Sequence, residues 1–228
     1  MAVTLDAMLR RLVLTFTVLA AIAAIGAVAA PAHAEPVAPV SPTAASEGLL
    51  DVRSVVPDAI VDLRYATSAN FVKQRLYPTN ARCLVHRSMA NGLRVAASRL
   101  RVTGNRLVFW DCYRPHSAQV RMYQVVPDAN WVAKPTNYAR SHESGRSVDV
   151  TLATRDGRRL DMGTGFDDFS ARAHAYATAG VSASAVGNRA RLRTAMQAGG
   201  LAPYSGEWWH FDGPGAGVDR PLLRAAVN

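Results

Sequence analysis

Hydrophobic and polar positions alternate most regularly two thirds of the way along the chain, where Val148, Val150 and Leu152 are separated by Asp149 and Thr151. A period of two is that of a β-strand, whose successive side chains point to opposite faces. Asp149 is therefore expected to face away from the apolar layer. Because a carboxylate held in mid-strand is costly unless a positive charge meets it, this strand predicts a cation site.

The rest of the pattern predicts further strands and helices joined by loops. Runs rich in β-forming residues predict strands at 60–65, 106–113 and 204–211, with a short return strand from Leu160 after a turn at 155–159. Apolar spacing and breaker residues predict helices at 84–100, 115–126 and 188–197. Irregular segments are expected at 66–82, 130–140 and 162–169. Together they predict an α+β domain whose central, mainly antiparallel sheet carries the cation site, with helices packed on it.

The N-terminal segment has the organisation of a secretory signal. Arg10 and Arg11 precede an apolar run at 13–30, and Ala-His-Ala at 32–34 predicts cleavage after Ala34. The chain is then secreted, periplasmic or held in the cell envelope, with no stable membrane association after cleavage. The apolar run is also long enough for an uncleaved N-terminal membrane anchor, which is the alternative. The absence of a cysteine near the cleavage point argues against a lipoprotein.

The remaining residues suit one folded domain at 50–228. Residues 35–49 are rich in Pro, Ala and Ser without an apolar period, which predicts a flexible lead-in, retained or not. Residues after Gly213 are expected to form a tail.

The chain is basic, with a formal net charge of +9 that falls to +8 when residues 1–34, with their two Arg and one Asp, are removed. A basic exported protein is attracted to an anionic envelope. The positive residues are scattered single arginines, without a basic run interleaved with aromatics, so nucleic acid is excluded as a partner. The sequence does not indicate the oligomeric state.

Two cysteines remain after cleavage, Cys83 and Cys112. In an oxidising compartment such a pair predicts one disulfide, which would stabilise the fold by about 3–4 kcal/mol. Two buried free thiols are the alternative, because spacing alone does not bring the Cβ atoms face to face. Neither cysteine has a nearby Cys or His, so both are excluded from the metal site.

Two histidines complete a candidate metal site. His142 precedes Asp149 by seven positions, and His210 lies near the C-terminus. A His, Asp, His set leaves the fourth position of a tetrahedral zinc ion open for water, which is typical of a hydrolytic site. One Zn²⁺ per chain is expected. The other histidines of the mature chain lack an acidic partner at useful spacing and are interpreted as surface or capping residues: His86, His116 and His174.

Glu207 and Arg114 are candidates for the chemistry itself. Glu207 lies three residues before His210 and is placed to act as general base. Since residues three apart on a strand face opposite sides, this role requires a bend or turn between them; a solvated strand-end carboxylate is the alternative. Arg114, between a strand end and a helix start, is placed to stabilise an oxyanion. The alternative for Arg114 is an ordinary ion pair with Asp111 or Asp156.

Four motifs carry a family resemblance: WDCYRPHSAQ, SHESGRSVDVTL, MGTGFDDF and YSGEWWHF. In this order and spacing the chain resembles, over about 55–211, the zinc D-alanyl-D-alanine dipeptidases of the vancomycin-resistance type, within the D-Ala-D-Ala carboxypeptidase and lysostaphin-like superfamily. The resemblance implies that His142, Asp149 and His210 bind zinc, that Glu207 is the base, and that Arg114 stabilises the transition state.

The resemblance also implies a small enclosed site that accepts a free dipeptide and reads its amino terminus. Asp167 and Tyr65 match positions that line this site. Arg140, two residues before His142, departs from the small hydroxyl residue common in the family, and is expected to change how the substrate carboxylate is held. The export signal is a second departure, because the resistance enzymes are cytoplasmic.

The expected function is therefore a zinc metallopeptidase that hydrolyses D-Ala-D-Ala, or related D-amino-acid dipeptides, released by peptidoglycan turnover. One alternative is a D,D-carboxypeptidase or murein endopeptidase acting on polymeric peptidoglycan. Another is a secreted domain that binds zinc or the cell wall without catalysis.

Overall fold

The structure is a computed structural model that describes residues 36–129 and 131–228. The expected signal segment at 1–34 lies outside the described residues. Within the described ranges, every helix is too short or too polar to cross a bilayer.

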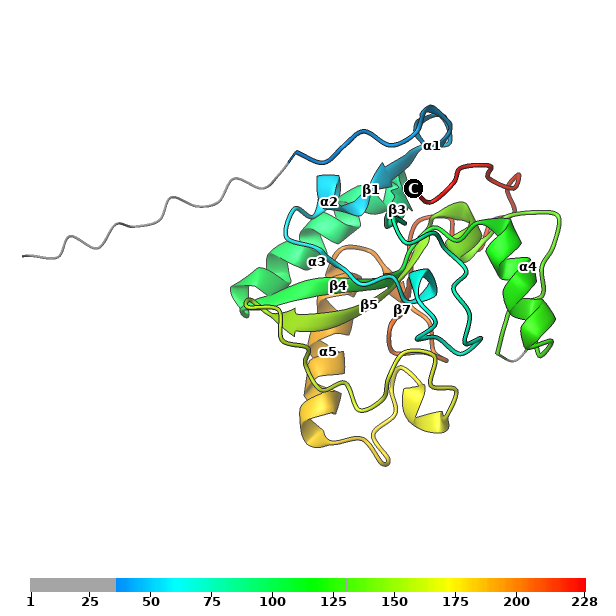
Figure 1. Cartoon of the computed structure of the whole chain (residues 1–228). Helices are drawn as coiled ribbons and strands as arrows, with labels where there is room; N and C mark the ends of the chain where they lie inside the picture. Colours follow the sequence, from blue (N-terminus) through cyan, green and yellow to red (C-terminus); the bar gives the residue numbers. More distant parts are fainter. Residues whose placement is uncertain (1–35, 130) are drawn as a thin grey trace, which may run out of the picture. The chain divides into compact units, whose positions relative to one another are not determined.

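A five-stranded sheet forms the centre of the domain (Figure 1). Its strands, in spatial order, are β2 (Ile60–Val61), β4 (Asn105–Asp111), β5 (Ser147–Thr154), β7 (His210–Asp212) and β6 (Ala202–Pro203). β2 runs parallel to β4, and the other neighbours are antiparallel. The α+β fold with a mainly antiparallel sheet is thus confirmed.

A second, two-stranded sheet pairs β1 (Leu49–Asp51) with β3 (Leu84–His86) in antiparallel fashion. Short 3₁₀ turns lie between the main elements: η1 (Arg64–Ala66), η2 (Arg87–Met89), η3 (Ser141–Ser144) and η4 (Ala171–Ala173).

Two long helices lie side by side along the sheet, α3 (Ala90–Val102) and α5 (Ala183–Ala198) (Figure 1). They approach closely at two glycines, since a Cβ added to Gly92 would lie 2.5 Å from the carbonyl oxygen of Gly199. The remaining helices are α1 (Pro42–Ser46), α2 (Val52–Val55) and α4 (His116–Val125). Side chains of α3 such as Leu93 and Leu100 are buried in the core, as the apolar period predicts.

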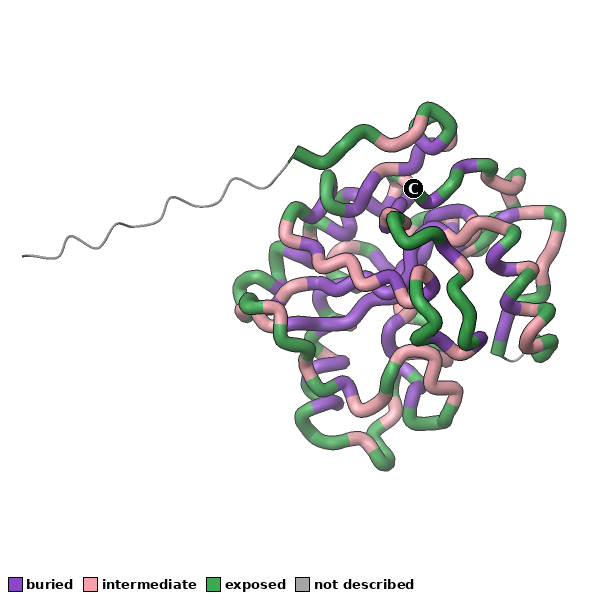
Figure 2. The backbone as a smooth tube through the Cα atoms, viewed as in Figure 1, coloured by how far each residue is buried: buried purple, intermediate pink, exposed green. Residues whose placement is uncertain are grey.

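The core is continuous through the sheet, and Figure 2 shows the central strands as its buried part. On β5, Val148, Val150 and Leu152 are fully buried. Asp149 and Thr151 alternate with them and are almost as inaccessible. The predicted alternation therefore holds, but the polar face of β5 is covered by protein.

The structure differs from the expected lead-in over its second half. Residues 42–46 form α1, whose first turn is capped by the Ser41 hydroxyl and begins with Pro42. Ala44 and Leu49 are fully buried. The expectation of a flexible segment up to residue 49 is wrong from Pro42 onward, because one helical turn is too short to show a period.

Three other element predictions change in detail. Residues 84–86 form a strand, so the predicted helix at 84–100 begins only at Ala90. The strand predicted at 60–65 ends at Val61. The return strand expected from Leu160 is reduced to a single bridge between Ala153 and Arg159.

The C-terminal segment is not a loose tail. The Tyr113 hydroxyl donates to the Ala225 carbonyl at 3.1 Å, and the Glu47 carboxylate accepts from the backbone N–H groups of Arg224 and Ala225. Ala225 and Val227 are buried. The expectation failed because this segment packs through isolated small residues and backbone bonds, which leave no periodic signal.

Candidate metal centre and active site

Strand pairing brings Asp149 and His210 together although they are 61 residues apart. They are direct partners in the register of β5 and β7. The Nδ1 atom of His210 lies 3.0 Å from Oδ1 of Asp149. Side chains at partner positions of an antiparallel pair share one face, so the register alone brings together two of the three predicted ligands.

His142 arrives from η3, the turn just before β5. Gly145 ends this turn with φ +66°, and a Cβ there would lie 2.7 Å from a methyl group of Leu49, so both backbone and packing call for glycine. The ring Nδ1–H donates to the Cys112 carbonyl at 2.8 Å. Its Nε2 is left to face the site, 3.1 Å from His210 Nδ1 and 3.3 Å from Asp149 Oδ1.

The donor set fits a metal ion. His142, Asp149 and His210 are the group of described residues whose ligand atoms lie close enough together to share a cation. A tetrahedral zinc with bonds of 2.0–2.1 Å would hold its ligand atoms about 3.3 Å apart, and the three separations here are 3.0–3.3 Å. The three side chains predicted as ligands therefore form one compact site.

Asp212 orients the second histidine. Its Oδ1 lies 3.1 Å from His210 Nε2, so Nε2–H donates to Asp212 and Nδ1 is turned toward Asp149. The Ser147 hydroxyl on β5 donates to the same carboxylate. Asp212 was missed in the sequence, although its position two residues after His210 places it on the same strand face.

Charges at this site favour a cation. Burial lowers the pKa of His210, but its bonds to Asp149 and Asp212 outweigh burial and raise the pKa to about 10. Burial opposes ionisation of Asp149, yet His142 and His210 hold its pKa well below the ordinary value. Two carboxylates thus converge on the imidazoles and create a strong preference for positive charge.

We expect Asp212→Ala to weaken metal binding by about 10–100-fold, because the carboxylate that fixes the His210 ring is lost. Competition with a chromophoric chelator measures the affinity. Asp156→Ala, in an exposed turn on the far part of β5, is the matched control and should bind as the parent does. Equal affinities for both variants would show that Asp212 does not orient the ligand.

Glu207 reaches the site because the chain does not continue as a strand. The strand predicted at 204–211 is interrupted by a turn at 205–206 and a bend at 208–209, with β6 and β7 on either side. Glu207 Oε2 therefore comes within 4.0 Å of His210 Nδ1. Burial and the nearby Asp149 carboxylate raise the pKa of Glu207. The bend required for convergence is present.

Arg114 lies beside the site in an ion pair with Asp111, the simpler of its two interpretations. Its Nε and Nη2 donate to Asp111 Oδ2 at 3.0 and 2.8 Å, and Nη1 donates to Gln119 at 2.7 Å. A register shift between Phe109 and Asp111 marks a bulge at the end of β4, and Asp111 is fully buried. The ion pair holds the guanidinium from behind while Arg114 lines the cavity over the metal ligands.

Tyr65 and Asp167 contact each other on the same cavity wall. The Tyr65 hydroxyl lies 3.2 Å from both carboxylate oxygens of Asp167. Asp167 has φ +56°, a left-handed conformation that aspartate tolerates better than most residues. Burial and the nearby Asp149 raise its pKa well above the ordinary value.

The cavity has a volume of about 430 Å³ and is lined by all eight residues predicted for the site. They are His142, Asp149, His210, Glu207, Arg114, Asp167, Tyr65 and Arg140.

Comparison with known proteins identifies the family. Residues 45–228 match the Peptidase_M15 family model, described as D-ala-D-ala dipeptidase. The chain belongs to this peptidase family. The chain is 38% identical to D-alanyl-D-alanine dipeptidase of Escherichia coli (strain K12) over 77% of its own length and 89% of that protein.

Enterococcal relatives are also similar to this M15 peptidase. D-alanyl-D-alanine dipeptidases of Enterococcus faecium and Enterococcus faecalis (strain ATCC 700802 / V583) are 31% and 30% identical, each over 66% of this chain and 83% of its relative. A solved LD-carboxypeptidase structure aligns with 57% of this chain and 59% of its own at 16% identity and a TM-score of 0.36, too low to support an argument.

Arg140 of this M15 peptidase lies at the rim of the cavity. Its side chain is half exposed, forms an ion pair with Asp219, and packs over the Tyr138 ring at 4.9 Å. The predicted position beside the site is therefore observed, together with a competing partner that the sequence did not indicate.

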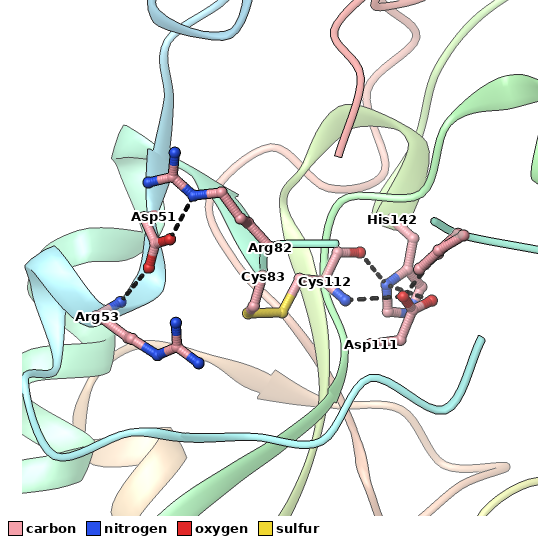
Figure 3. Close-up of a disulfide and its surroundings, with 8 residues drawn as sticks. Asp51, Arg53, Arg82, Cys83, Asp111, Cys112 and His142 are labelled. Atoms are coloured by element: carbon pink, nitrogen blue, oxygen red, sulfur yellow. Dashed lines mark hydrogen bonds and ion pairs between the residues drawn. A yellow bond between two sulfur atoms is a disulfide. The ribbon is translucent and has the colours of Figure 1, made fainter. Parts of the chain in front are cut away.

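The disulfide between Cys83 and Cys112 is present, and Figure 3 shows Cys112 beside Asp111 and His142. Cys112 carries the carbonyl that accepts from His142, and its own N–H donates to Asp111. The covalent link therefore fixes the peptide that orients one ligand of the M15 site, and both cysteines are excluded as ligands, as predicted.

One assignment of a side chain near the site changes. His116, interpreted as lacking an acidic partner, has its Nδ1 2.7 Å from Glu143, which also lines the cavity. The two are 27 residues apart, so spacing along the chain gave no signal. Of the two adjacent tryptophans, Trp209 lines the cavity, and Trp208 is buried with its N–H donating to Thr164.

Proposed function

We propose that the chain is a zinc-dependent D-alanyl-D-alanine dipeptidase that hydrolyses D-Ala-D-Ala or a closely related D-amino-acid dipeptide. The observation that carries the proposal is the convergence of a His, Asp, His cluster and a half-buried glutamate on one cavity, in a chain of the dipeptidase family. Zinc bound there would supply Lewis acidity, which activates water and polarises the peptide carbonyl.

Glu207 takes the role of proton carrier. Its carboxylate is largely buried beside His210, and burial raises its pKa toward the value that a general base needs near neutral pH. It accepts a proton from the attacking water and passes it to the leaving amine. The turn between β6 and β7 holds it over the ligand cluster without making it a fourth ligand.

Arg114 stabilises the negative charge that develops on the carbonyl oxygen. Asp111 accepts from Nε and Nη2 and Gln119 accepts from Nη1, so the guanidinium is held in place before the reaction. In this interpretation the ion pair with Asp111 positions the catalytic arginine.

Asp167 receives the amino terminus of the substrate. It is a half-buried carboxylate that accepts from the neutral Tyr65 hydroxyl, and burial and the nearby Asp149 raise its pKa. A substrate ammonium beside it would favour its charged form. Arg140, which also lines the cavity, is free to hold the substrate carboxylate only if it leaves Asp219.

The proposed source of the substrate is based on the expected export of the chain. An enzyme released into the envelope after signal cleavage meets dipeptide released from the wall, so we propose a role in recycling peptidoglycan fragments. Hydrolysis of polymeric stem peptides and metal binding without turnover are the two outcomes that would replace this proposal.

A hydrolysis panel tests the proposed function. We expect release of D-Ala from free D-Ala-D-Ala and no release from a stem pentapeptide. A chelator should abolish the activity, and added zinc should restore it. Dipeptides of mixed chirality measure the stereochemical preference for the substrate residue that would lie beside Arg140. Cleavage of the pentapeptide would indicate a carboxypeptidase instead. Stoichiometric zinc without hydrolysis of any substrate would indicate a binding domain.

A further inference from the structure

A cluster of positive side chains lies outside the catalytic cavity, where three segments distant in sequence meet. Arg87 begins η2 immediately after His86 at the end of β3, Arg146 immediately precedes β5, and Arg220 belongs to the C-terminal segment. We call these three arginines and His86 the arginine cluster. None of its members lines the catalytic cavity.

The imidazole of His86 connects two of the arginines. Arg146 Nη2 donates to His86 Nε2 at 3.1 Å, while Arg146 Nη1 donates to the Ser88 hydroxyl at 2.7 Å and the Pro214 carbonyl at 2.8 Å. One point beside Gly48, where a Cβ would stand, lies 3.1 Å from His86 Nε2 and 3.3 Å from Arg87 Nε. Arg87 and His86 therefore lie beside the same glycine.

A second glycine marks where Arg146 and Arg220 converge. The Cβ position of Gly215 lies 2.7 Å from Arg220 Nη2 and 3.8 Å from Arg146 Nη1. Gly215 has φ +76°, so glycine suits the backbone there, and its missing side chain leaves room for both guanidinium groups. The positively charged guanidinium groups of Arg146 and Arg220 thus both lie beside Gly215.

No carboxylate balances the cluster among the residues that the structure describes. The ion pairs of this part of the chain include none with Arg87, Arg146 or Arg220. The Nε atoms of Arg146 and Arg220 are buried without a hydrogen-bond partner. Buried polar atoms without partners are rare in native proteins, and a bound ion or water is one explanation for them.

The surrounding charges agree with this interpretation. Burial, followed by Arg220 and Arg87, lowers the pKa of Arg146. Burial and then Arg146, Arg87 and Arg220 lower the pKa of His86 to about 4, so the ring stays neutral and accepts from Arg146. The charges that shift the pKa of Arg146 and of His86 are all positive, and no negative side chain among the described residues offsets their repulsion.

We infer that the arginine cluster is a binding site for a tetrahedral oxyanion of the phosphate or sulfate type. Guanidinium groups match such ions through paired N–H donors, and no carboxylate among the described residues forms an ion pair with these three arginines. The ion is either free phosphate or the phosphodiester of an envelope polymer. Because Arg146 also holds Pro214, and Arg220 bridges to Ala139 through the backbone, a bound anion would tie the C-terminal segment to β3 and β5.

Phosphate binding to the full folded chain tests the inference without any measurement of turnover. Inorganic phosphate is titrated by calorimetry and by thermal melting, with sodium chloride at matched ionic strength as the reference. We expect saturable binding and a melting temperature raised by about 3–5 °C at ten times the Kd. Arg220→Gln and Arg87→Gln should each weaken binding at least tenfold. Arg146→Gln is avoided because it also removes the bonds to Ser88 and Pro214.

Arg99→Gln, an exposed charge on α3, is the matched control and should bind phosphate as the parent does. A phosphodiester such as glycerophosphoglycerol distinguishes the source: tighter binding than inorganic phosphate assigns the site to a polymer, and weaker binding assigns it to the free ion. The inference is overturned if phosphate acts no more strongly than chloride, or if Arg220→Gln and Arg87→Gln bind phosphate as well as Arg99→Gln does.

Discussion

Glu207→Gln is expected to lower kcat for D-Ala-D-Ala by about 10²–10⁴-fold while the metal stays bound. The amide keeps the size of the side chain but cannot accept the proton of the attacking water, and loss of a general base costs an effect of this order. The carboxylate is 4.0 Å from a ligand nitrogen and is not needed to complete the ligand set. Steady-state kinetics together with elemental analysis of the purified variant measure both halves of the prediction.

A matched control separates the base from a general effect of cavity charge. Glu143→Gln also removes a carboxylate from the cavity wall, but Glu143 is paired with His116 and not with a ligand. We expect a much smaller loss of kcat for this variant. If Glu207→Gln retains activity within a few-fold of the parent, the assigned base is wrong, whatever the metal content.

Removing the disulfide by the double change Cys83→Ser and Cys112→Ser is expected to lower the free energy of unfolding by about 3–4 kcal/mol. The bridge joins residues separated by 29 positions and restricts the unfolded chain accordingly. For a domain of this size the melting temperature should fall by roughly 10 °C. Urea unfolding of the parent and the double variant, both without reductant, measures the difference.

The same change should weaken metal binding, because the Cys112 carbonyl orients the His142 ring and the bridge fixes that peptide. Reductant should move the parent toward the double variant and leave the variant unchanged. A parent whose unfolding is insensitive to reductant, and equal to that of the variant, would contradict a stabilising role for the bridge.

The sequence singles out the three side chains that converge because each of them has a local signal. Asp149 stands in a strict alternation of apolar residues, and His142 and His210 lie in short motifs beside it and near the C-terminus. Their meeting depends on the β5 to β7 register, which places Asp149 opposite His210 and which no local pattern specifies. The reach of Glu207 depends on a turn at 205–206 that the strand prediction at 204–211 does not include.

Partners that only tertiary structure brings close were beyond prediction. The Asp111 carboxylate accepts from the Tyr77 hydroxyl, 34 residues away, and Glu143 pairs with His116, 27 residues away. Short elements failed for another reason, because α1 and β3 are too brief for a period to appear. The packed C-terminal segment depends on backbone bonds, to which side-chain patterns are blind.

Asp149 and His210 sit opposite each other on β5 and β7, and outside β7 lies only the two-residue β6. An ion bound by both side chains would therefore also hold β7 and β6 against β5. Removal of the ion would let these two strands separate from β5, whose exposed backbone N–H and C=O groups could then pair with a strand of another molecule. Preparations kept in strong chelators would then lose protein to aggregation as well as activity.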